Sequence, residues 1–325
     1  MSVNKSVCAV IVTYNRKEYL LSLLQALSVQ TYKLCGILVF DNHSSDGTDV
    51  RLVEEGFVSS CEENVLHTGI VENTPLFYYR NSENTGGSGG FHDGMKLALN
   101  MGTDYLWVMD DDVLPEPDCL ERLVQFSDEN AKICIPNRTD ERFQDRAITS
   151  IDKKNPFCRF RRLKTSMLDT DIPGQYTEVC DMPFEGPLIA TTLIHEIGLP
   201  KKELFILFDD TEFAQRAVRV TRIRFVKGAT LHRQIVATIK ESQQMGWKDY
   251  YYHRNQFYFY ETYGENIWVR YLRPRIGILK MYIRSIARGK WSNFAVLHAA
   301  YRDGTKGILG KTVEPTNPFC YNKKK

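Results

Sequence analysis

Residues 7–13, VCAVIVT, form an unbroken apolar run in which five of the seven side chains are β-branched. A strand without polar alternation must be covered on both faces, as strands are inside parallel sheets flanked by helices. Leucines at helical spacing follow over 20–27, and a second apolar run, GILVF, spans 36–40. The sequence therefore predicts a β-α-β unit at its start.

The same alternation continues further along the chain. It predicts strands over 76–79 and 105–109, a helix from about 91 to 100 between them, and later strands over 204–208 and 222–226. A charged stretch, 138–175, shows little periodicity, and we expect a long loop there. The fold class predicted is α/β, a mixed, mostly parallel sheet flanked by helices.

Composition excludes several classes of protein. The 325 residues are 43% hydrophobic and 25% charged, which is typical of a globular protein and rules out bulk disorder. The net charge is only +2, so there is no global reason to expect a nucleic-acid partner. Oligomeric state is left open.

The end of the chain differs from the rest in charge. Residues 270–311 include ten Lys or Arg and one acid, a local charge of +9. Ile276, Leu279, Ile283 and Ile286 could form an apolar stripe beside these cations, as in a helix that lies on an anionic membrane. A helix packed on its own domain explains the pattern equally well. We expect a catalytic domain over 1–235 and a mainly helical, basic region over 236–325, close to the acceptor or a membrane.

Cysteine usage and hydropathy favour a cytoplasmic location. The eight cysteines include no C-x-x-C pair, and Cys8 and Cys35 lie in or beside apolar runs, so we expect buried, reduced thiols. No stretch approaches the roughly 18 apolar residues of a spanning helix. Together with the basic tail, this predicts a protein peripheral to the inner face of the cell membrane.

The clearest chemical signal is WVMDDD, residues 107–112, where an apolar strand runs directly into three carboxylates. Burying acids is costly unless a cation binds them, and Mg²⁺ and Mn²⁺ prefer carboxylate oxygens. Alternation along an extended chain would direct Asp110 and Asp112 to the same side. His232, after a later strand, could add an imidazole ligand or be merely structural.

Three further motifs follow predicted strands. Tyr14 and Asn15, then Asp41, stand at strand ends that should share one rim with the aspartates, where α/β sheets bind ligands. The turn NTGGSGGF, residues 84–91, permits close approach of backbone to a diphosphate or a sugar. Asp209 and Asp210 precede a helix, where either could be a general base or simply an N-cap.

Taken in order, six segments of this sequence resemble the family 2 inverting glycosyltransferases of the GT-A fold. They are VCAVIVTYNR, LVFDNHSSDGT, NTGGSGGFHDGM, WVMDDD, FDDTEFAQR and His232, spread over roughly residues 5–235. The glycine turn and the DDD run are most similar to those of the galactofuranosyltransferase and rhamnosyltransferase branches.

This resemblance implies roles for individual residues. Asp210 would be the catalytic base, with Asp209 as the alternative, and Asp112 and His232 would ligate Mn²⁺ or Mg²⁺, with Asp110 beside them. Trp247 would contact the acceptor. The residues implied to border the nucleotide sugar are Thr13, Tyr14, Asn15, Asp41, Asn84, Gly86, Gly87, Gly90, Asp110 and Asp111.

The activity implied is transfer of a sugar, with galactofuranose from UDP-galactofuranose expected first, to a hydroxyl of a lipid-linked or surface-polysaccharide glycan. The alternative donor is dTDP-rhamnose, which would make the protein a rhamnosyltransferase. A catalytically silent scaffold that binds nucleotide sugars is an alternative of another class. A nucleotidyltransferase is disfavoured, because VIVTYNRKEYL lacks the glycines of a triphosphate-binding loop.

Overall fold

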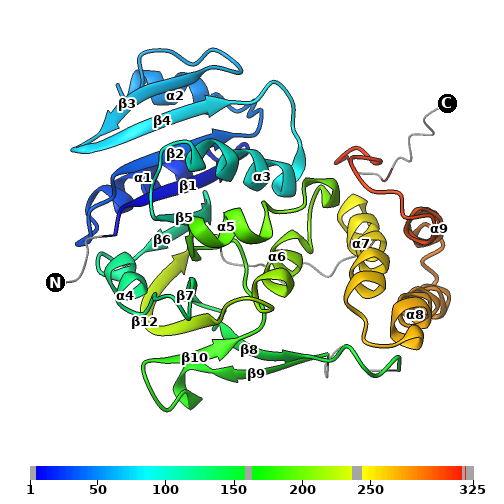
Figure 1. Ribbon diagram of the computed structural model, residues 1–325. Coiled ribbons are helices and arrows are strands. Elements are labelled where there is room, and N and C mark those ends of the chain that lie inside the picture. Colours follow the sequence, from blue (N-terminus) through cyan, green and yellow to red (C-terminus); the bar gives the residue numbers. More distant parts are fainter. Residues whose placement is uncertain (1–4, 158–162, 236–243, 317–318, 320–325) are drawn as a thin grey trace.

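The computed structural model describes residues 5–157, 163–235, 244–316 and 319. A central sheet with helices against it makes up the larger part, and three C-terminal helices form a separate layer beside it (Figure 1). The helices α3, α5 and α6 lie between the sheet and the C-terminal layer in this view. The site described below lies where these parts meet.

The sheet is mixed and has a parallel centre. Strand β1 (Val7–Thr13) pairs in parallel with β2 (Gly36–Asp41) and with β5 (Tyr105–Asp110), and β2 pairs in parallel with β4 (Thr74–Arg80). Across the sheet the order is β10-β12-β7-β11-β5-β1-β2-β4-β3, with β6 paired to β12. The remaining strands of this sheet are β3 (Leu66–Val71), β6 (Val113–Pro115), β7 (Ile133–Thr139), β10 (Tyr176–Val179), β11 (Leu188–Ala190) and β12 (Ile223–Arg233).

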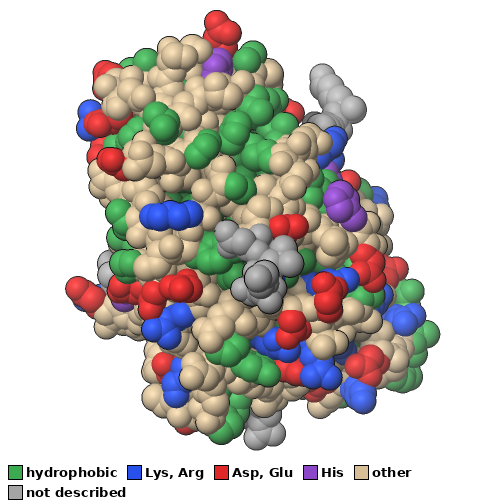
Figure 2. All heavy atoms as spheres, turned by 60° about the vertical axis from the view of Figure 1, so that its left-hand side comes forward, with side chains coloured by type: hydrophobic (Ala, Val, Ile, Leu, Met, Phe, Trp, Pro, Cys, Tyr) green, Lys and Arg blue, Asp and Glu red, His purple; other side chains and the backbone are tan. Residues whose placement is uncertain are grey.

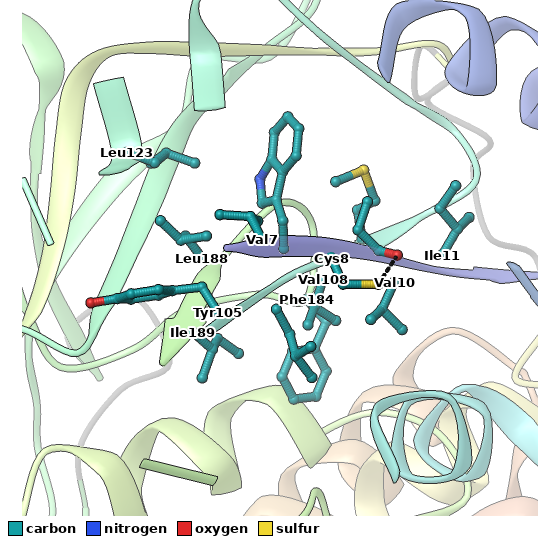
Figure 3. Packing of buried hydrophobic residues seen from close by; sticks show 14 of the residues in the cluster. Val7, Cys8, Val10, Ile11, Tyr105, Val108, Leu123, Phe184, Leu188 and Ile189 are labelled. Atoms are coloured by element: carbon teal, nitrogen blue, oxygen red, sulfur yellow. Dashed lines mark hydrogen bonds between the residues drawn. The ribbon is translucent and has the colours of Figure 1, made fainter. Parts of the chain in front are cut away.

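Burial along β1 explains why its sequence is apolar throughout. All seven of its residues are buried, and its side chains pack with those of β5 and β11 and with Phe184 (Figure 3). Trp107 of β5, fully buried, keeps its indole N–H satisfied by donating to the Gly186 carbonyl at 2.9 Å. Full burial of each aliphatic side chain contributes about 1.5–3 kcal/mol, so this strand anchors the sheet.

Helices cover the sheet and build the C-terminal layer. Those associated with the sheet are α1 (Lys17–Ser28), α2 (Thr48–Glu54), α3 (Gly86–Leu99), α4 (Cys119–Gln125), α5 (Thr191–Ile197) and α6 (Asp209–Ala217). The C-terminal helices are α7 (Trp247–Tyr263), α8 (Arg273–Ala287) and α9 (Asn293–Thr305), which share a second apolar core. No described helix has the length and hydrophobicity needed to cross a bilayer.

The structure corrects four local predictions. The charged stretch 138–175 includes the antiparallel hairpin β8 (Arg146–Ile151) and β9 (Lys164–Leu168) as well as the end of β7. Helix α3 begins at Gly86, inside the glycine turn, and not near residue 91. Cys35 is exposed just before β2; the six cysteines for which the structure describes a state are free thiols.

The fourth correction concerns 204–208, where the apolar sequence predicts a strand. Phe205, Leu207 and Phe208 instead have φ values of +67°, +67° and +71°. A strand requires negative φ, and left-handed backbone at apolar residues is strained, so the segment is an irregular loop held by its surroundings. We call residues 204–208 the catalytic loop, because it leads directly into Asp209 and Asp210, the residues expected from the sequence to include the catalytic base.

Candidate active site

Strand ends that are far apart in the sequence meet at one cavity of about 330 Å³, here called the donor cavity. Residues from the ends of β1, β2 and β5 line it together with the glycine turn, the catalytic loop and the start of α7. The lining residues are Val12, Thr13, Tyr14, Arg16, Asn42, Asn84, Gly86, Gly87, Asp110, Asp111, Phe205, Ile206, Trp247, Lys248 and Pro315. This position, beyond the carboxyl ends of parallel strands, is where open α/β sheets bind ligands.

Asp111 is the best-satisfied acid of the cavity. Its carboxylate accepts hydrogen bonds from the Thr13 hydroxyl at 2.7 Å, the Tyr14 backbone N–H at 3.2 Å and the Arg16 guanidinium at 2.9 Å. Burial nevertheless raises the pKa of Asp111 to about 6, because the Arg16 charge and these hydrogen bonds only partly offset the loss of water. Asp111 thus fixes the end of β1 against the end of β5.

Three residues expected at the nucleotide, Asn15, Asp41 and Gly90, are not among those that line the donor cavity. Asp41 is fully buried, accepting from the Ser44 backbone N–H at 2.7 Å and from the Tyr78 hydroxyl at 2.8 Å, and burial raises its pKa. Asn15 accepts from the Ser45 N–H at 2.6 Å. Asp41 and Asn15 both brace the loop that follows β2.

Asn42, which sequence reasoning missed, lines the cavity in their place. Its side-chain oxygen accepts from the Thr85 backbone N–H at 3.0 Å, and its amide nitrogen donates to the Gly86 carbonyl at 2.9 Å. Its position directly after the predicted strand end at Asp41 was the available signal. Asn42 thereby holds the glycine turn against the end of β2.

The glycines are required by close contacts. Gly86 has φ +76°, and a Cβ there would lie 2.1 Å from the Phe205 carbonyl oxygen of the catalytic loop. At Gly90 a Cβ would lie 2.6 Å from Val12 Cγ1 of β1, whereas Gly87 faces open space in the cavity. The turn therefore packs against the loop on one side and leaves backbone accessible on the other.

The three aspartates after β5 are positioned differently from one another. Asp110 lines the donor cavity, and its pKa is raised well above the usual range by burial and by the nearby charges of Asp112, Glu185 and Asp111. Asp112 pairs with Arg16 at 2.9 Å. Such a concentration of negative charge favours a bound cation.

His232 does not join these acids in this arrangement. Its Nε2 lies 2.6 Å from the Glu116 carboxylate, and both side chains are exposed. Across the described ranges of the chain, no three His, Cys, Asp or Glu side chains are grouped so as to hold a metal ion. The metal site formed by Asp110, Asp112 and His232 therefore stays a prediction.

Asp210 opens onto a second cavity of about 620 Å³, here called the charged cavity. The residues that line it are Ile135, Arg138, Arg142, Phe143, Gln144, Asp145, Arg146, Ile148, Lys164, Asp181, Met182, Pro183, Glu185, Asp210 and Thr211. Four cations and four acids stand among them. Charged side chains of both signs gather on the lower half of the face shown in Figure 2.

Asp209 and Asp210 begin helix α6 and have raised pKa values. Burial is the main cause for both, and the Asp209 charge raises the pKa of Asp210 further. Asp181 acts in the same direction, whereas the Lys164 ammonium acts in the opposite one. Asp210 is a partly buried carboxylate with a raised pKa that lines a cavity, and such a group is suited to accept a proton near neutral pH.

The catalytic loop is held by two fully buried residues of α7. The Asn255 amide donates to the carbonyls of Leu204, Ile206 and Leu207 at 3.1, 2.9 and 2.9 Å, and Arg254 Nη2 donates to the Leu204 carbonyl at 2.9 Å. On the other side, the Ser88 N–H of α3 donates to the Phe205 carbonyl at 3.0 Å. The strained backbone is thereby determined by both the sheet region and the C-terminal layer.

Trp247, expected at the acceptor, lies among the residues of the donor cavity at the first turn of α7. Its ring packs edge-on against Tyr251, with centroids 6.3 Å apart. The C-terminal layer therefore supplies part of the wall around the expected nucleotide site.

Known proteins with sequences similar to this chain are glycosyltransferases. The family model described as Glycosyl transferase family 2 matches residues 8–176. Over 231 residues, 67% of this chain and 67% of the relative, the sequence is 29% identical to galactofuranosyltransferase GlfT1 of Mycolicibacterium smegmatis. It is also 33% identical to abequosyltransferase RfbV of Salmonella typhimurium over 130 residues, 39% of this chain and 34% of that one.

A solved structure supports the fold. The crystal structure of GalNAc-T7 with UDP, GalNAc and Mn²⁺ matches with a TM-score of 0.55 at 14% identity, over 95% of this chain and 59% of that one. Together with the mixed sheet and the C-terminal helices, this confirms the predicted GT-A type architecture. Because the family model covers more than half of the sequence, the chain belongs to glycosyl transferase family 2.

Proposed function

We propose that this chain is an inverting glycosyltransferase that transfers the sugar of a nucleoside diphosphate sugar to an acceptor hydroxyl. The observation that carries the proposal is the path of residues 205–211. Phe205 and Ile206 line the donor cavity, whereas Asp210 and Thr211 line the charged cavity. One short segment thus lines the cavity proposed for the nucleotide and also carries the carboxylate proposed as the base.

The reaction would be a single displacement. The acceptor oxygen forms a bond to the anomeric carbon as the bond from that carbon to the diphosphate oxygen breaks, and the diphosphate leaves with the electron pair. Asp210 accepts the proton of the acceptor hydroxyl. The donor cavity binds and orients the nucleotide, and a fixed geometry of this kind supplies much of the rate enhancement.

A divalent cation, Mn²⁺ or Mg²⁺, is part of the proposal. The charge gathered around Asp110 fits such an ion, which proteins commonly bind through one or two carboxylates together with substrate phosphates. Asp110 and Asp112 would hold it, and His232 would have to leave Glu116 to join them. When bound, the ion would neutralise charge that grows on the departing diphosphate.

The galactofuranosyltransferase relative favours UDP-galactofuranose as the donor. The abequosyltransferase relative is named for a different sugar, so the donor is not fixed by the relatives and dTDP-rhamnose is the alternative. A silent nucleotide-sugar scaffold is disfavoured, since a binding protein has no need of a partly buried base candidate with a raised pKa in a second cavity. We propose a glycan, or a glycan linked to a lipid, as the acceptor.

We also propose that the C-terminal layer binds the anionic lipids at the inner face of the cell membrane. Leu279, Ile283 and Ile286 on α8 are 57%, 57% and 52% exposed, and Trp268 and Trp291 are 63% and 62% exposed. Residues 270–293 include seven Lys or Arg and no acid. An exposed apolar stripe flanked by cations is typical of amphipathic helices that lie in the membrane interface.

The test of the transferase proposal is an Asp210→Asn variant assayed for sugar transfer and for donor binding. Loss of transfer by at least a hundredfold, with the donor dissociation constant within threefold of wild type, is expected because only the proton acceptor is removed. Asp118→Asn, at an exposed acid paired with Arg122, is the matched control and should retain full activity. Turnover retained in Asp210→Asn would remove this residue from the role of base.

A further inference from the structure

A small cavity of about 140 Å³ lies among the three helices of the C-terminal layer (Figure 1). We call it the basic cavity, because three of its nine lining residues are cations and only one is an acid. The lining residues are Gln244, Met245, Asp249, Met281, Arg284, Ser285, Arg288, Lys290 and Asn293. None of them lines the donor cavity or the charged cavity, so the basic cavity is a separate feature of the molecule.

Two buried polar side chains hold the walls of the basic cavity together. The Asn293 amide nitrogen donates to the Ser285 hydroxyl at 3.1 Å, and the Asn293 side-chain oxygen accepts from the Met245 backbone N–H at 2.9 Å. Ser285 and Asn293 are both buried. The first residue of α9 thus joins the end of α8 to the segment that precedes α7, and the cavity has a fixed shape.

The cations come from the end of α8 and from the turn that follows it. Arg284 and Arg288 are four residues apart and therefore project from the same face of the helix. Gly289, with φ +65°, ends the helix in the left-handed conformation, and the Lys290 N–H donates to the Ser285 carbonyl at 2.8 Å. This turn returns Lys290 to the cavity that the two arginines line.

The two arginines are not neutralised by acids of the protein. Within the ranges of the chain that the structure describes, neither Arg284 nor Arg288 forms an ion pair or a side-chain hydrogen bond. Asp249, the one acid of the lining, accepts from the Gly246 backbone N–H at 2.9 Å at the start of α7. Guanidinium groups form strong, charge-assisted hydrogen bonds with phosphate oxygens, often two at a time. The basic cavity therefore offers an enclosed site with an excess of positive charge.

We propose that the basic cavity binds a phosphate group. Its volume of about 140 Å³ is below the roughly 300 Å³ at which cavities for larger organic ligands begin, which suits a single phosphate. The phosphate belongs to the headgroup of an anionic lipid or to a small soluble compound. Arg284 directly follows Ile283 of the exposed apolar stripe on α8, which favours the lipid. The inference goes beyond the transferase function and does not depend on it.

The first experiment measures binding of inorganic phosphate to the full chain by broadening of its phosphorus NMR signal. The cavity variant, Arg284→Gln with Arg288→Gln, should bind phosphate at least tenfold more weakly, because two charge-assisted partners are lost. Both side chains are exposed, so the variant should fold. The matched control, Arg275→Gln with Lys280→Gln, removes two cations of α8 that lie outside the cavity and should keep wild-type affinity.

The second experiment identifies the source of the phosphate. Galactolipid vesicles that contain phosphatidic acid are compared with galactolipid vesicles that contain oleate at the same surface charge. If a lipid headgroup is the ligand, wild-type protein sediments more strongly with the phosphatidic acid vesicles, and the cavity variant loses this preference whereas the matched control keeps it. Cavity-dependent binding of inorganic phosphate without such a preference identifies a small soluble phosphate as the ligand.

Three results would overturn the inference. One is the absence of inorganic phosphate binding together with no preference for phosphatidic acid. Another is equal weakening in the cavity variant and the matched control, which would indicate diffuse attraction by the basic region and no defined site. The third is wild-type affinity in the folded cavity variant. Neither variant changes a residue of the donor cavity, so failure here and failure of the transferase proposal are distinguishable.

Discussion

At the scale of single residues, Asp209 and Asp210 form an interacting pair at the start of α6. Burial raises the pKa of both, and the Asp209 charge raises the pKa of Asp210 further. A base works only in its ionised form, so activity should rise with pH as Asp210 loses its proton. We therefore expect this pair to set the acid limb of the pH profile.

Replacing Asp209 by Asn should move that acid limb to lower pH. The substitution removes a neighbouring negative charge, which lowers the pKa of Asp210 and leaves more of it ionised in mild acid. The measurement is kcat/KM against pH for wild type and Asp209→Asn, with Glu196→Gln, an exposed partner of Lys132, as control. An acid limb that stays in place or moves to higher pH would contradict the assignment.

At the scale of elements, α7 controls the shape of the catalytic loop. Asn255→Ala would leave the carbonyls of Ile206 and Leu207 without their side-chain donor, whereas the Leu204 carbonyl keeps the Arg254 guanidinium. An unpaired buried polar group costs about 1–3 kcal/mol, and small displacements of reacting groups can cost a hundredfold in rate. We expect a lower melting temperature and kcat reduced at least tenfold, with a smaller change in donor affinity.

The control for this prediction is Asn266→Ala, which removes an exposed amide that donates to the Lys154 carbonyl near the end of α7. It should have little effect on kcat. A folded Asn255→Ala enzyme with wild-type kcat would show that the loop keeps its geometry without α7.

Prediction from sequence succeeded for elements whose signal is local. The apolar run of β1 and the leucines of α1 become a buried strand and an amphipathic helix, as their periodicities indicate. It failed at 204–208, because FILF has strand propensity, whereas contacts from Ser88 and Asn255, distant in sequence, impose left-handed backbone. The β8–β9 hairpin was missed because its strands are short, begin with a charged residue and contain few apolar side chains.

At the candidate site too, only the residues with a local sequence signal could be predicted. Strand-end positions identified Thr13, Tyr14 and Asp110, because parallel strands bring their ends to one edge. The charged cavity was beyond sequence reasoning, since its walls combine β7 to β9 with α6. Only the tertiary arrangement brings Lys164 and Asp210 to the same cavity.

At the scale of the whole molecule, the C-terminal layer joins the proposed membrane surface to the proposed active site. Helix α8 carries the exposed apolar stripe, and α7, which packs beside it, clamps the catalytic loop. A lipid-linked acceptor could thus reach the site from a membrane on which the same layer rests. The two proposals are independent and can be tested apart.

The membrane proposal predicts sedimentation with vesicles. Wild-type protein should sediment with vesicles that contain anionic lipid at low salt, less at high salt because charge attraction is screened, and hardly at all with neutral vesicles. Leu279→Ser with Ile283→Ser should reduce binding at least fivefold, whereas Val50→Ser, at an exposed position on α2, should not. Absence of binding even at low salt would contradict the proposal.

The central claim is that the donor cavity binds a nucleotide sugar with help from a divalent cation at the aspartates after β5. Calorimetric titration with UDP-galactofuranose and dTDP-rhamnose, with and without Mn²⁺, tests it without any acceptor. We expect one of these donors to bind, with affinity strengthened at least tenfold by Mn²⁺ in wild type and not in Asp112→Ala. Binding of neither donor, or Mn²⁺ dependence that survives in Asp112→Ala, would contradict it.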